Sequence, residues 1–271
     1  MSRTPEQIRH HYEVEKSIAT RLKAASRNER KRIYETMYDD LFREVPHHPR
    51  LTRREDPAAV ARYTKRKLQL LKPFFSKSSV VAEFGSGDGN LAVAASAHFK
   101  HVYAIDISDQ RKSELHQPEN MTFVVFDGYS LELPDDSVDV VYSDMLIEHL
   151  HPDDTKLHFE TALRILRPGG VYVFRAPHRL SGPWDVSRAF DREASCFHLK
   201  EWTYSEMTEL LNGLGVENFN SYWVAKGIRV RIPVLMYVRI ENLLLCFPHP
   251  IKRFLARLIA PVMCMNVFKP K

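Results

Sequence analysis

The sequence VVAEFGSGDG occupies residues 80–89 and joins two different kinds of segment. Residues 80–84 form a short, mostly apolar run with the composition of a buried β-strand. Glycines follow at positions 85, 87 and 89, and the alanine-rich stretch from about residue 90 to residue 99 predicts a helix. A strand, a glycine-rich turn and a helix in this order bring backbone N–H groups to a ligand at the carboxyl end of the strand. The stretch therefore predicts a binding site in an α/β protein.

Compact apolar runs that resemble further strands lie downstream of this stretch, and a helix is expected between the last two of them. The runs occupy residues 101–105, 122–126, 138–143 and 171–176, and the helix spans about residues 155–166. Continuous apolar runs are typical of parallel strands that are buried on both faces. The alternation of strands and helices predicts a Rossmann-like, doubly wound α/β fold. One more strand is expected at residues 219–225.

The length and the charge distribution define three parts of the chain. The 271 residues, with 44% hydrophobic and 27% charged side chains, suit one sizeable globular domain with extensions. Residues 1–56 predict an N-terminal helical extension, residues 57–225 the core with a lid or substrate insertion at 177–202, and residues 226–271 a basic amphipathic extension. Residues 226–271 carry nine basic and one acidic side chains, whereas residues 58–225 carry 17 and 23. A mildly acidic core therefore precedes a strongly basic end.

Cysteine spacing and hydropathy exclude several classes of protein. Cys196, Cys246 and Cys264 are too widely spaced for a CxxC metal pair or a dense disulfide framework, so a reducing compartment fits best. No run of about 18 apolar residues predicts a membrane span. We expect a cytoplasmic protein, or one peripheral to the membrane.

The spacing of the glycines separates two kinds of cofactor site. A dinucleotide fingerprint is G-x-G-x-x-G, whereas Glu83 here precedes G-x-G-x-G. Asp106 follows Gly85 by 21 residues, at the end of the next strand, where a carboxylate can accept both hydroxyl hydrogens of a ribose. E-F-G-S-G-D-G thus resembles the first motif of class I S-adenosylmethionine-dependent methyltransferases, specifically the type 11 branch that acts on small molecules and glycans.

This resemblance implies a seven-stranded, mostly parallel sheet, S-adenosylmethionine as cofactor and S-adenosylhomocysteine as product. It places Asp106 at the ribose, Asp127 and Gly128 beside the adenine, and Asp144 next to the methionine moiety. Taken singly, Asp127 could instead be a turn former and Asp144 a helix cap. The cofactor-binding residues implied are Glu83, Gly85, Ser86, Gly87, Gly89, Asp106, Ile107, Asp127, Gly128, Ser143 and Asp144.

Methyl transfer needs alignment of the reacting atoms and, for a hydroxyl acceptor, removal of a proton. His149, His178 and His198 are the candidate catalytic bases, since they follow the fourth and fifth strands and imidazole titrates near neutrality. His149 could equally have a helix-start or packing role. No metal is expected. A site made of Asp144, Glu148 and His149 is the alternative, but neighbouring side chains diverge on a helix.

The acceptor implied is a small molecule, a glycan or a lipid-linked intermediate, methylated at oxygen. Residues 226–271 mix apolar clusters with arginine and lysine, which predicts peripheral contact with a membrane. Nucleic acid is disfavoured as a partner because no known RNA-binding motif accompanies the pI of about 9.0. The alternatives are a quinone or lipid methyltransferase at the membrane surface, an RNA methyltransferase, and a non-catalytic subunit that binds S-adenosylmethionine.

Overall fold

Four helices precede the sheet in the computed structural model, which describes residues 3–111, 116–225 and 228–271. They are α1 (Pro5–Ala24), α2 (Arg27–Glu44), α3 (Pro49–Arg54) and α4 (Pro57–Leu71), followed by the 3₁₀ turn η1 (Lys72–Phe74). Asp56 caps α4 by accepting from the N–H groups of Ala58 and Ala59, and Pro57 occupies the first turn. Asp56 and Pro57 thus fix the start of α4.

The central sheet is Rossmann-like and mostly parallel on one side, as predicted. Its parallel strands are β1 (Ser76–Phe84), β2 (Phe99–Asp106), β3 (Met121–Val125), β4 (Val138–Asp144) and β5 (Leu166–Pro177). The strands β6 (Phe219–Ala225), β7 (Ile228–Ile232) and β8 (Val262–Phe268) complete the order β3-β2-β1-β4-β5-β8-β6-β7. Within the described residues the sheet thus has eight strands rather than seven. The additional strand is β7, which pairs antiparallel with β6 at the edge.

The position of β8 corrects the boundary expected at residue 225. This strand comes from the segment 226–271, yet it lies between β5 and β6 and pairs antiparallel with both. Its residues from Met263 to Val267 are buried. The basic end of the chain therefore supplies an interior strand of the sheet, and it is not an extension outside the core.

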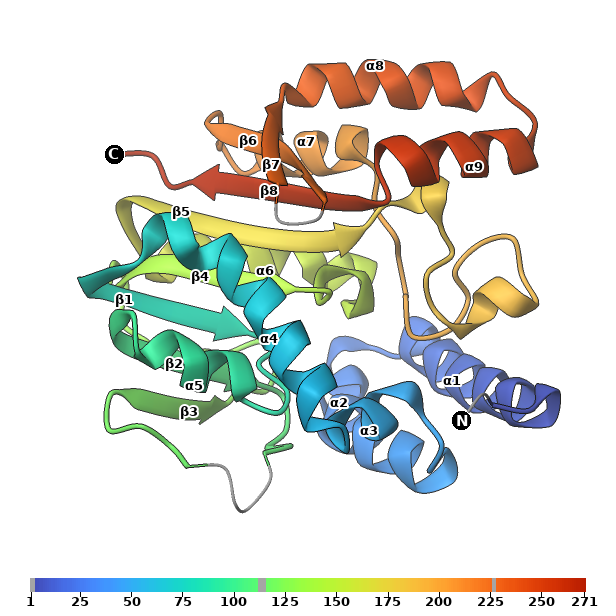
Figure 1. Cartoon of the computed structure of the whole chain (residues 1–271), viewed down its shortest axis with the longest axis horizontal. Coiled ribbons are helices and arrows are strands. Elements are labelled where there is room, and N and C mark those ends of the chain that lie inside the picture. Colours follow the sequence, from blue (N-terminus) through green and yellow to red (C-terminus); the bar gives the residue numbers. More distant parts are fainter. Residues whose placement is uncertain (1–2, 112–115, 226–227) are drawn as a thin grey trace.

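Helices cover both faces of the sheet. The helices α6 (Pro152–Ile165) and α7 (Tyr204–Gly213) contribute to the larger hydrophobic core, and α5 (Asn90–Ser96) packs with α4 in a second core on β1 and β2. Thr203 and Glu206 form a capping box at the start of α7. The helices α8 (Val234–Leu245) and α9 (His249–Ile259) form a hairpin beside β8 (Figure 1).

The N-terminal helices form a third core with the insertion that follows β5. Figure 1 shows α1, α2 and α3 beyond the carboxyl ends of the parallel strands. Phe197 and Leu199 of the insertion pack among apolar residues of α1 and α2. The insertion also holds the 3₁₀ turns η3 (Arg179–Ser181) and η4 (Val186–Ala189). No helix in the described part of the chain combines the length and hydropathy needed to cross a bilayer.

Candidate active site

The glycine turn after β1 and the acid after β2 meet as the sequence predicts. Gly87 has φ +57°, which L-residues with a side chain rarely adopt, and its N–H donates to Oδ2 of Asp106 at 2.7 Å. Asp106 is largely buried, and burial raises the pKa of its carboxyl despite this hydrogen bond. The strand ends thus hold one carboxylate at the turn, poised for the hydroxyl groups of a ligand.

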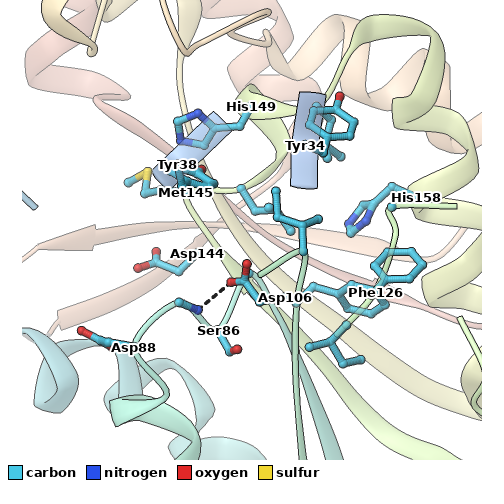
Figure 2. Close-up of a pocket in the computed structure, with 18 of the residues that line it drawn as sticks. Tyr34, Tyr38, Ser86, Asp88, Asp106, Phe126, Asp144, Met145, His149 and His158 are labelled. Atoms are coloured by element: carbon cyan, nitrogen blue, oxygen red, sulfur yellow. Dashed lines mark hydrogen bonds between the residues drawn. The ribbon is translucent and has the colours of Figure 1, made fainter. Parts of the chain in front are cut away.

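A cavity of about 340 Å³ opens above this turn, at the carboxyl ends of the parallel strands. Figure 2 shows Ser86, Asp88 and Asp106 on one side of it, with Tyr34, Tyr38 and His149 across from them. Phe126 and His158 lie at its flank in the same view. Seven of the eleven predicted cofactor-binding residues line this cavity: Gly85, Ser86, Gly87, Asp106, Ile107, Gly128 and Asp144.

The other four predicted residues do not line the cavity. Gly89 is the N-cap residue of α5. Ser143 is fully buried, and its hydroxyl forms a hydrogen bond with the hydroxyl of Tyr172. Asp127 accepts from the N–H groups of Tyr129 and Ser130 at 2.8 and 2.7 Å, as expected for a turn former. Glu83 lies beneath the turn, 3.7 Å from Nζ of Lys67, and burial raises its pKa to about 8.

Asp144 is held in a network of cations at the end of β4. Arg175 donates from Nε to Oδ1 at 2.7 Å and approaches the same oxygen with its second nitrogen at 2.6 Å. The hydroxyl of Tyr63 donates to Oδ2 at 3.3 Å, and Nζ of Lys67 lies 3.8 Å away. A buried carboxylate is stable only with such partners. The carboxyl group of Asp144 is therefore fixed in the cavity wall by Arg175, Tyr63 and Lys67.

Residues of the N-terminal helices complete the cavity, and the sequence pattern did not identify them as site residues. Among these residues, Arg50 of α3 lies against the glycine turn. Its guanidinium is so close to Gly87 that a Cβ added there would lie only 2.6 Å from one guanidinium nitrogen. The signal present in the sequence is a polar pair, Tyr63 and Lys67, one turn apart on the face of α4 that carries Leu70 and Leu71. The contributed residues are Tyr34, Met37, Tyr38, Arg50, Arg53, Tyr63 and Lys67.

Only His149 of the three predicted histidines lines the cavity in the described structure. Its Nδ1 bonds to the carbonyl oxygen of Phe197 at 2.8 Å. Burial, aided by the charge of His198, lowers its pKa to about 3, so His149 is neutral near pH 7. It lies on a single 3₁₀ turn, η2 (Ile147–His149), at the end of β4. His149 therefore presents a neutral imidazole to the cavity.

His178 and His198 are placed elsewhere. His178 is fully buried and its Nε2 bonds to Oε1 of Glu241 on α8 at 2.6 Å, so it connects β5 to that helix. His198 bonds through Nδ1 to Oε1 of Glu201 at 2.7 Å. Burial alone would lower the pKa of His198, but Glu201 and the charge of Glu148 outweigh burial and raise it to about 9. Its imidazole is thus already protonated near pH 7, which does not suit a general base.

Comparisons with known proteins agree with this geometry. Residues 82–174 match the family described as Methyltransferase domain. The chain has the fold of a class I methyltransferase. It resembles a solved partner of the Trm112 methyltransferase activator from Haloferax volcanii, with a TM-score of 0.55 and 19% identity over 81% of this chain and 97% of that one. A phosphoethanolamine N-methyltransferase 2 from Haemonchus contortus, solved with S-adenosylhomocysteine, gives a TM-score of 0.54 and 19% identity over 76% of this chain and 53% of that one.

Curated relatives match parts of the chain. A probable S-adenosylmethionine-dependent methyltransferase of Mycolicibacterium smegmatis is 40% identical over 97 residues, which are 36% of this chain and 35% of that protein. One from Mycobacterium tuberculosis is 30% identical over 152 residues, or 56% of this chain and 53% of that protein. The chain thus spans between a third and about half of the length of these relatives. The comparisons support S-adenosylmethionine as the cofactor, as the sequence predicts.

Proposed function

We propose that this protein transfers the methyl group of S-adenosylmethionine to an oxygen atom of a small-molecule, glycan or lipid-linked acceptor. The observation that carries the proposal is the cavity at the carboxyl ends of β1, β2 and β4, where Gly87, Asp106 and Asp144 lie together. In this reaction the new O–C bond forms as the S–C bond of the sulfonium breaks. The electron pair stays on sulfur, and the hydroxyl proton leaves to water.

The residues around the cavity divide it into two ends. Asp106 would accept the ribose hydroxyls, and Phe126 and Gly128 would lie beside the adenine. His149 and Tyr38 line the cavity across from the glycine turn, which makes this the acceptor end. The main task of these residues is to hold the acceptor in line with the methyl group and to exclude water. Oxygen is our proposal for the acceptor atom, because a hydroxyl needs the polar surroundings that this end supplies.

Turnover tests the proposal directly. The full-length protein is incubated with methyl-labelled S-adenosylmethionine and panels of hydroxylated small molecules, glycans and lipid-linked sugars, and transfer of the label is measured. In Asp106→Ala, loss of two hydrogen bonds to a charged group, each worth about 1.5–3 kcal/mol, should weaken cofactor binding roughly a hundredfold or more. Asp109→Ala, which removes an exposed acid in the next turn, is the matched control. Cofactor binding that survives Asp106→Ala and Gly87→Arg would disprove the site, and binding without transfer would favour a non-catalytic subunit.

We also propose that the α8–α9 hairpin places the protein on an anionic membrane. Its exposed side chains form an apolar surface beside basic residues, including Arg239 and Arg257. Arg257 donates to the carbonyl oxygen of Ser181, so α9 contacts the insertion whose residue Phe197 bonds to His149. The hairpin would thereby bring a lipid-linked acceptor toward the cavity. The exposed apolar residues are Leu235, Met236, Leu243, Leu245, Phe247, Ile251, Phe254 and Leu258.

Vesicle binding tests this second proposal. The apolar residues Phe254 and Leu258 are both replaced by serine, which leaves every strand of the sheet intact. We expect the wild-type protein to sediment with phosphatidylserine-containing vesicles and the double variant to lose most of that binding, because insertion depends on buried apolar area. Val125→Ser, an exposed apolar residue at the far edge of the sheet, is the control. Equal sedimentation of all three proteins, or no sedimentation of the wild type, would contradict the proposal.

A further inference from the structure

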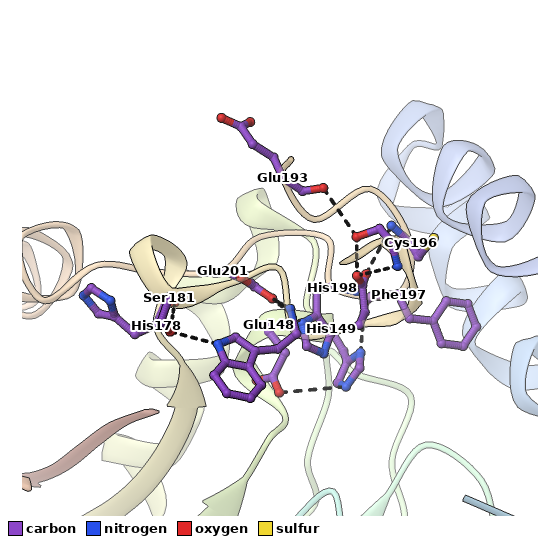
Figure 3. Close-up of polar contacts among 12 residues, drawn as sticks. Glu148, His149, His178, Ser181, Glu193, Cys196, Phe197, His198 and Glu201 are labelled. Atoms are coloured by element: carbon purple, nitrogen blue, oxygen red, sulfur yellow. Dashed lines mark hydrogen bonds and ion pairs between the residues drawn. The ribbon is translucent and has the colours of Figure 1, made fainter. Parts of the chain in front are cut away.

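Three side chains with metal-ligand chemistry converge behind the acceptor end of the cavity. Glu148 and His149 belong to η2, and His198 comes from the insertion some fifty residues later. One ligand atom from each residue lies within 4.8 Å of the others. Figure 3 shows the three together, with Oε1 of Glu148 4.0 Å from Nε2 of His149. The cluster thus joins the end of β4 to the insertion.

Glu148 is the unusual member of this cluster. Its side chain has no exposed surface, and neither carboxylate oxygen has a hydrogen-bond partner among the described residues. Leaving a buried carboxylate without a donor is costly, so such groups are normally paired, hydrogen-bonded or bound to a metal. Nε2 of His149 lies 4.0 Å from Oε1 of Glu148, too far for a hydrogen bond, and His198 makes no hydrogen bond to either oxygen. The carboxylate therefore faces the two imidazoles across a gap.

The hydrogen bonds of the two histidines orient the second nitrogen of each ring. The carbonyl oxygen of Phe197 can only accept, so Nδ1 of His149 carries a hydrogen and Nε2 is left with its lone pair. Nδ1 of His198 bonds in the same way to the carboxylate of Glu201. A carbonyl or carboxylate behind each ring is the arrangement that holds metal-binding histidines in place. Nε2 is thus the ligand atom that both rings offer.

A second cluster in the same protein shows the opposite arrangement. His11 and His48 both lie near Glu15. Nδ1 of His11 faces the guanidinium of Arg3, which can only donate, and Nδ1 of His48 accepts from the N–H of Arg50. Both rings therefore carry their hydrogen on Nε2 and direct it to Oε1 of Glu15, at 2.7 and 3.4 Å. Hydrogen bonds alone satisfy that cluster.

We propose that Glu148, His149 and His198 bind a divalent transition-metal ion of the zinc type. Two imidazoles and one carboxylate are a common ligand set for a site that keeps a coordination position open, and imidazole favours zinc over magnesium or calcium. Ligand atoms about 2.1 Å from a tetrahedral ion lie about 3.4 Å apart. Small side-chain shifts would bring the 4.0 Å pair to this separation. The ion takes the place of the proton on Nε2 of His198.

The ion would bind the acceptor hydroxyl at this end of the cavity. This assignment rests on the proposed methyl transfer. His149 lines the cavity, so an open coordination position beside it faces the acceptor. A bound cation lowers the pKa of a hydroxyl that it coordinates and holds its oxygen in place. The sequence predicted no metal because adjacent side chains diverge on a helix. That reasoning does not apply to a 3₁₀ turn whose third ligand comes from the insertion.

Zinc binding is measured without cofactor or acceptor. The full-length protein is treated with a chelator, dialysed and titrated with Zn²⁺ in a calorimeter, and its metal content is then determined after gel filtration. We expect the wild type to retain one equivalent, and Glu148→Gln and His198→Asn each to lower zinc affinity tenfold or more. His48→Asn is the control, since asparagine preserves the cap on α3 and removes a ring from the second cluster. Mg²⁺ should not compete.

A measurement on the unmodified protein guards against variants that fail to fold. Co²⁺ bound by the wild type should give the ligand-field absorption of a nitrogen and oxygen site with four or five ligands. The proposal is overturned if the wild type binds neither ion, if both folded variants retain zinc, or if only His48→Asn loses it. Zinc binding without any methyl transfer would instead disprove the proposed function and leave the metal site standing.

Discussion

Arg50 approaches the glycine turn from α3, and we propose that it binds the charged amino-acid part of the cofactor. Its guanidinium lies over the ring of Tyr38, 5.0 Å from the centroid, and close to the backbone of Gly87. A guanidinium in this position matches a carboxylate, because its N–H groups can donate two parallel hydrogen bonds. The methionine part of S-adenosylmethionine carries such a carboxylate. In the proposed complex Arg50 would thus complement Asp106, which we propose accepts the ribose hydroxyls.

The role of Arg50 can be separated from that of Asp106 with two ligands, one that carries the amino-acid moiety and one that lacks it. In Arg50→Gln we expect the affinity for S-adenosylhomocysteine to fall roughly ten- to a hundredfold, the value of a hydrogen bond to a charged group. Binding of methylthioadenosine, which lacks the amino-acid moiety, should be unchanged. Calorimetry on both ligands measures this, with Arg43→Gln on the surface of α2 as the control. Equal losses for the two ligands would mean that Arg50 supports only the fold of the cavity.

Site residues that directly follow a strand can be predicted from the sequence, whereas site residues that reach the same cavity from the N-terminal helices cannot. Gly87, Asp106 and Asp144 were predicted because each comes directly after an apolar run, and parallel strands end at one edge of the sheet. Arg50 and Tyr38 were not, because a helical pattern shows which face is buried without showing what lies against it. His178 illustrates the reverse error. It follows a strand, but its partner is Glu241 of α8, whose position the sequence does not reveal.

At the scale of elements, α2, α3 and α4 form one wall of the site rather than an appendage. The sequence predicted a helical extension over residues 1–56, and α4 follows it from Pro57. The assignment of residues 1–56 as an extension describes the chain order only. In space, Tyr34 of α2, Arg50 of α3 and Lys67 of α4 all line the cavity. Access of ligands to the strand ends therefore depends on the packing of these helices.

The insertion between β5 and α7 connects this wall to the sheet. The sequence predicted residues 177–202 as a lid or substrate insertion, and its aromatic residues Trp184, Phe190 and Phe197 are divided between two environments. In the structure Phe197 packs into the core of α1 and α2, while Trp184 and Phe190 lie outside the cavity lining. The insertion acts on the site through His198 and through the carbonyl oxygen of Phe197 behind His149. Aromatic content marks residues able to pack, but it does not show which core, if any, they pack into.

At the scale of the whole molecule, the charge count over residues 226–271 did not reveal that this segment contains the interior strand β8. Residues 226–271 hold nine basic and one acidic side chains, which suggested a surface extension. The strand β8 within them has no charged side chain, and it pairs with β5 from Val171 to Pro177. An average over 46 residues therefore hides a seven-residue, uncharged and mostly apolar run that only a shorter window would detect. The fold of the sheet is complete only when the last residues of the chain have joined it.

This topology predicts that the end of the chain cannot be removed without loss of the fold. Deleting residues 262–271 exposes the edges of β5 and β6 and removes the buried side chains of Met263, Met265 and Val267. Each such side chain stabilises the fold by about 1.5–3 kcal/mol, so the sum approaches the whole stability of a typical domain, about 5–15 kcal/mol. We expect loss of cooperative thermal unfolding and rapid proteolysis, measured by circular dichroism and limited trypsin digestion. As a control, deletion of only residues 270–271 should leave thermal unfolding and protease resistance unchanged, since Lys271 is exposed. A folded, protease-resistant 1–261 fragment would show that β8 is dispensable.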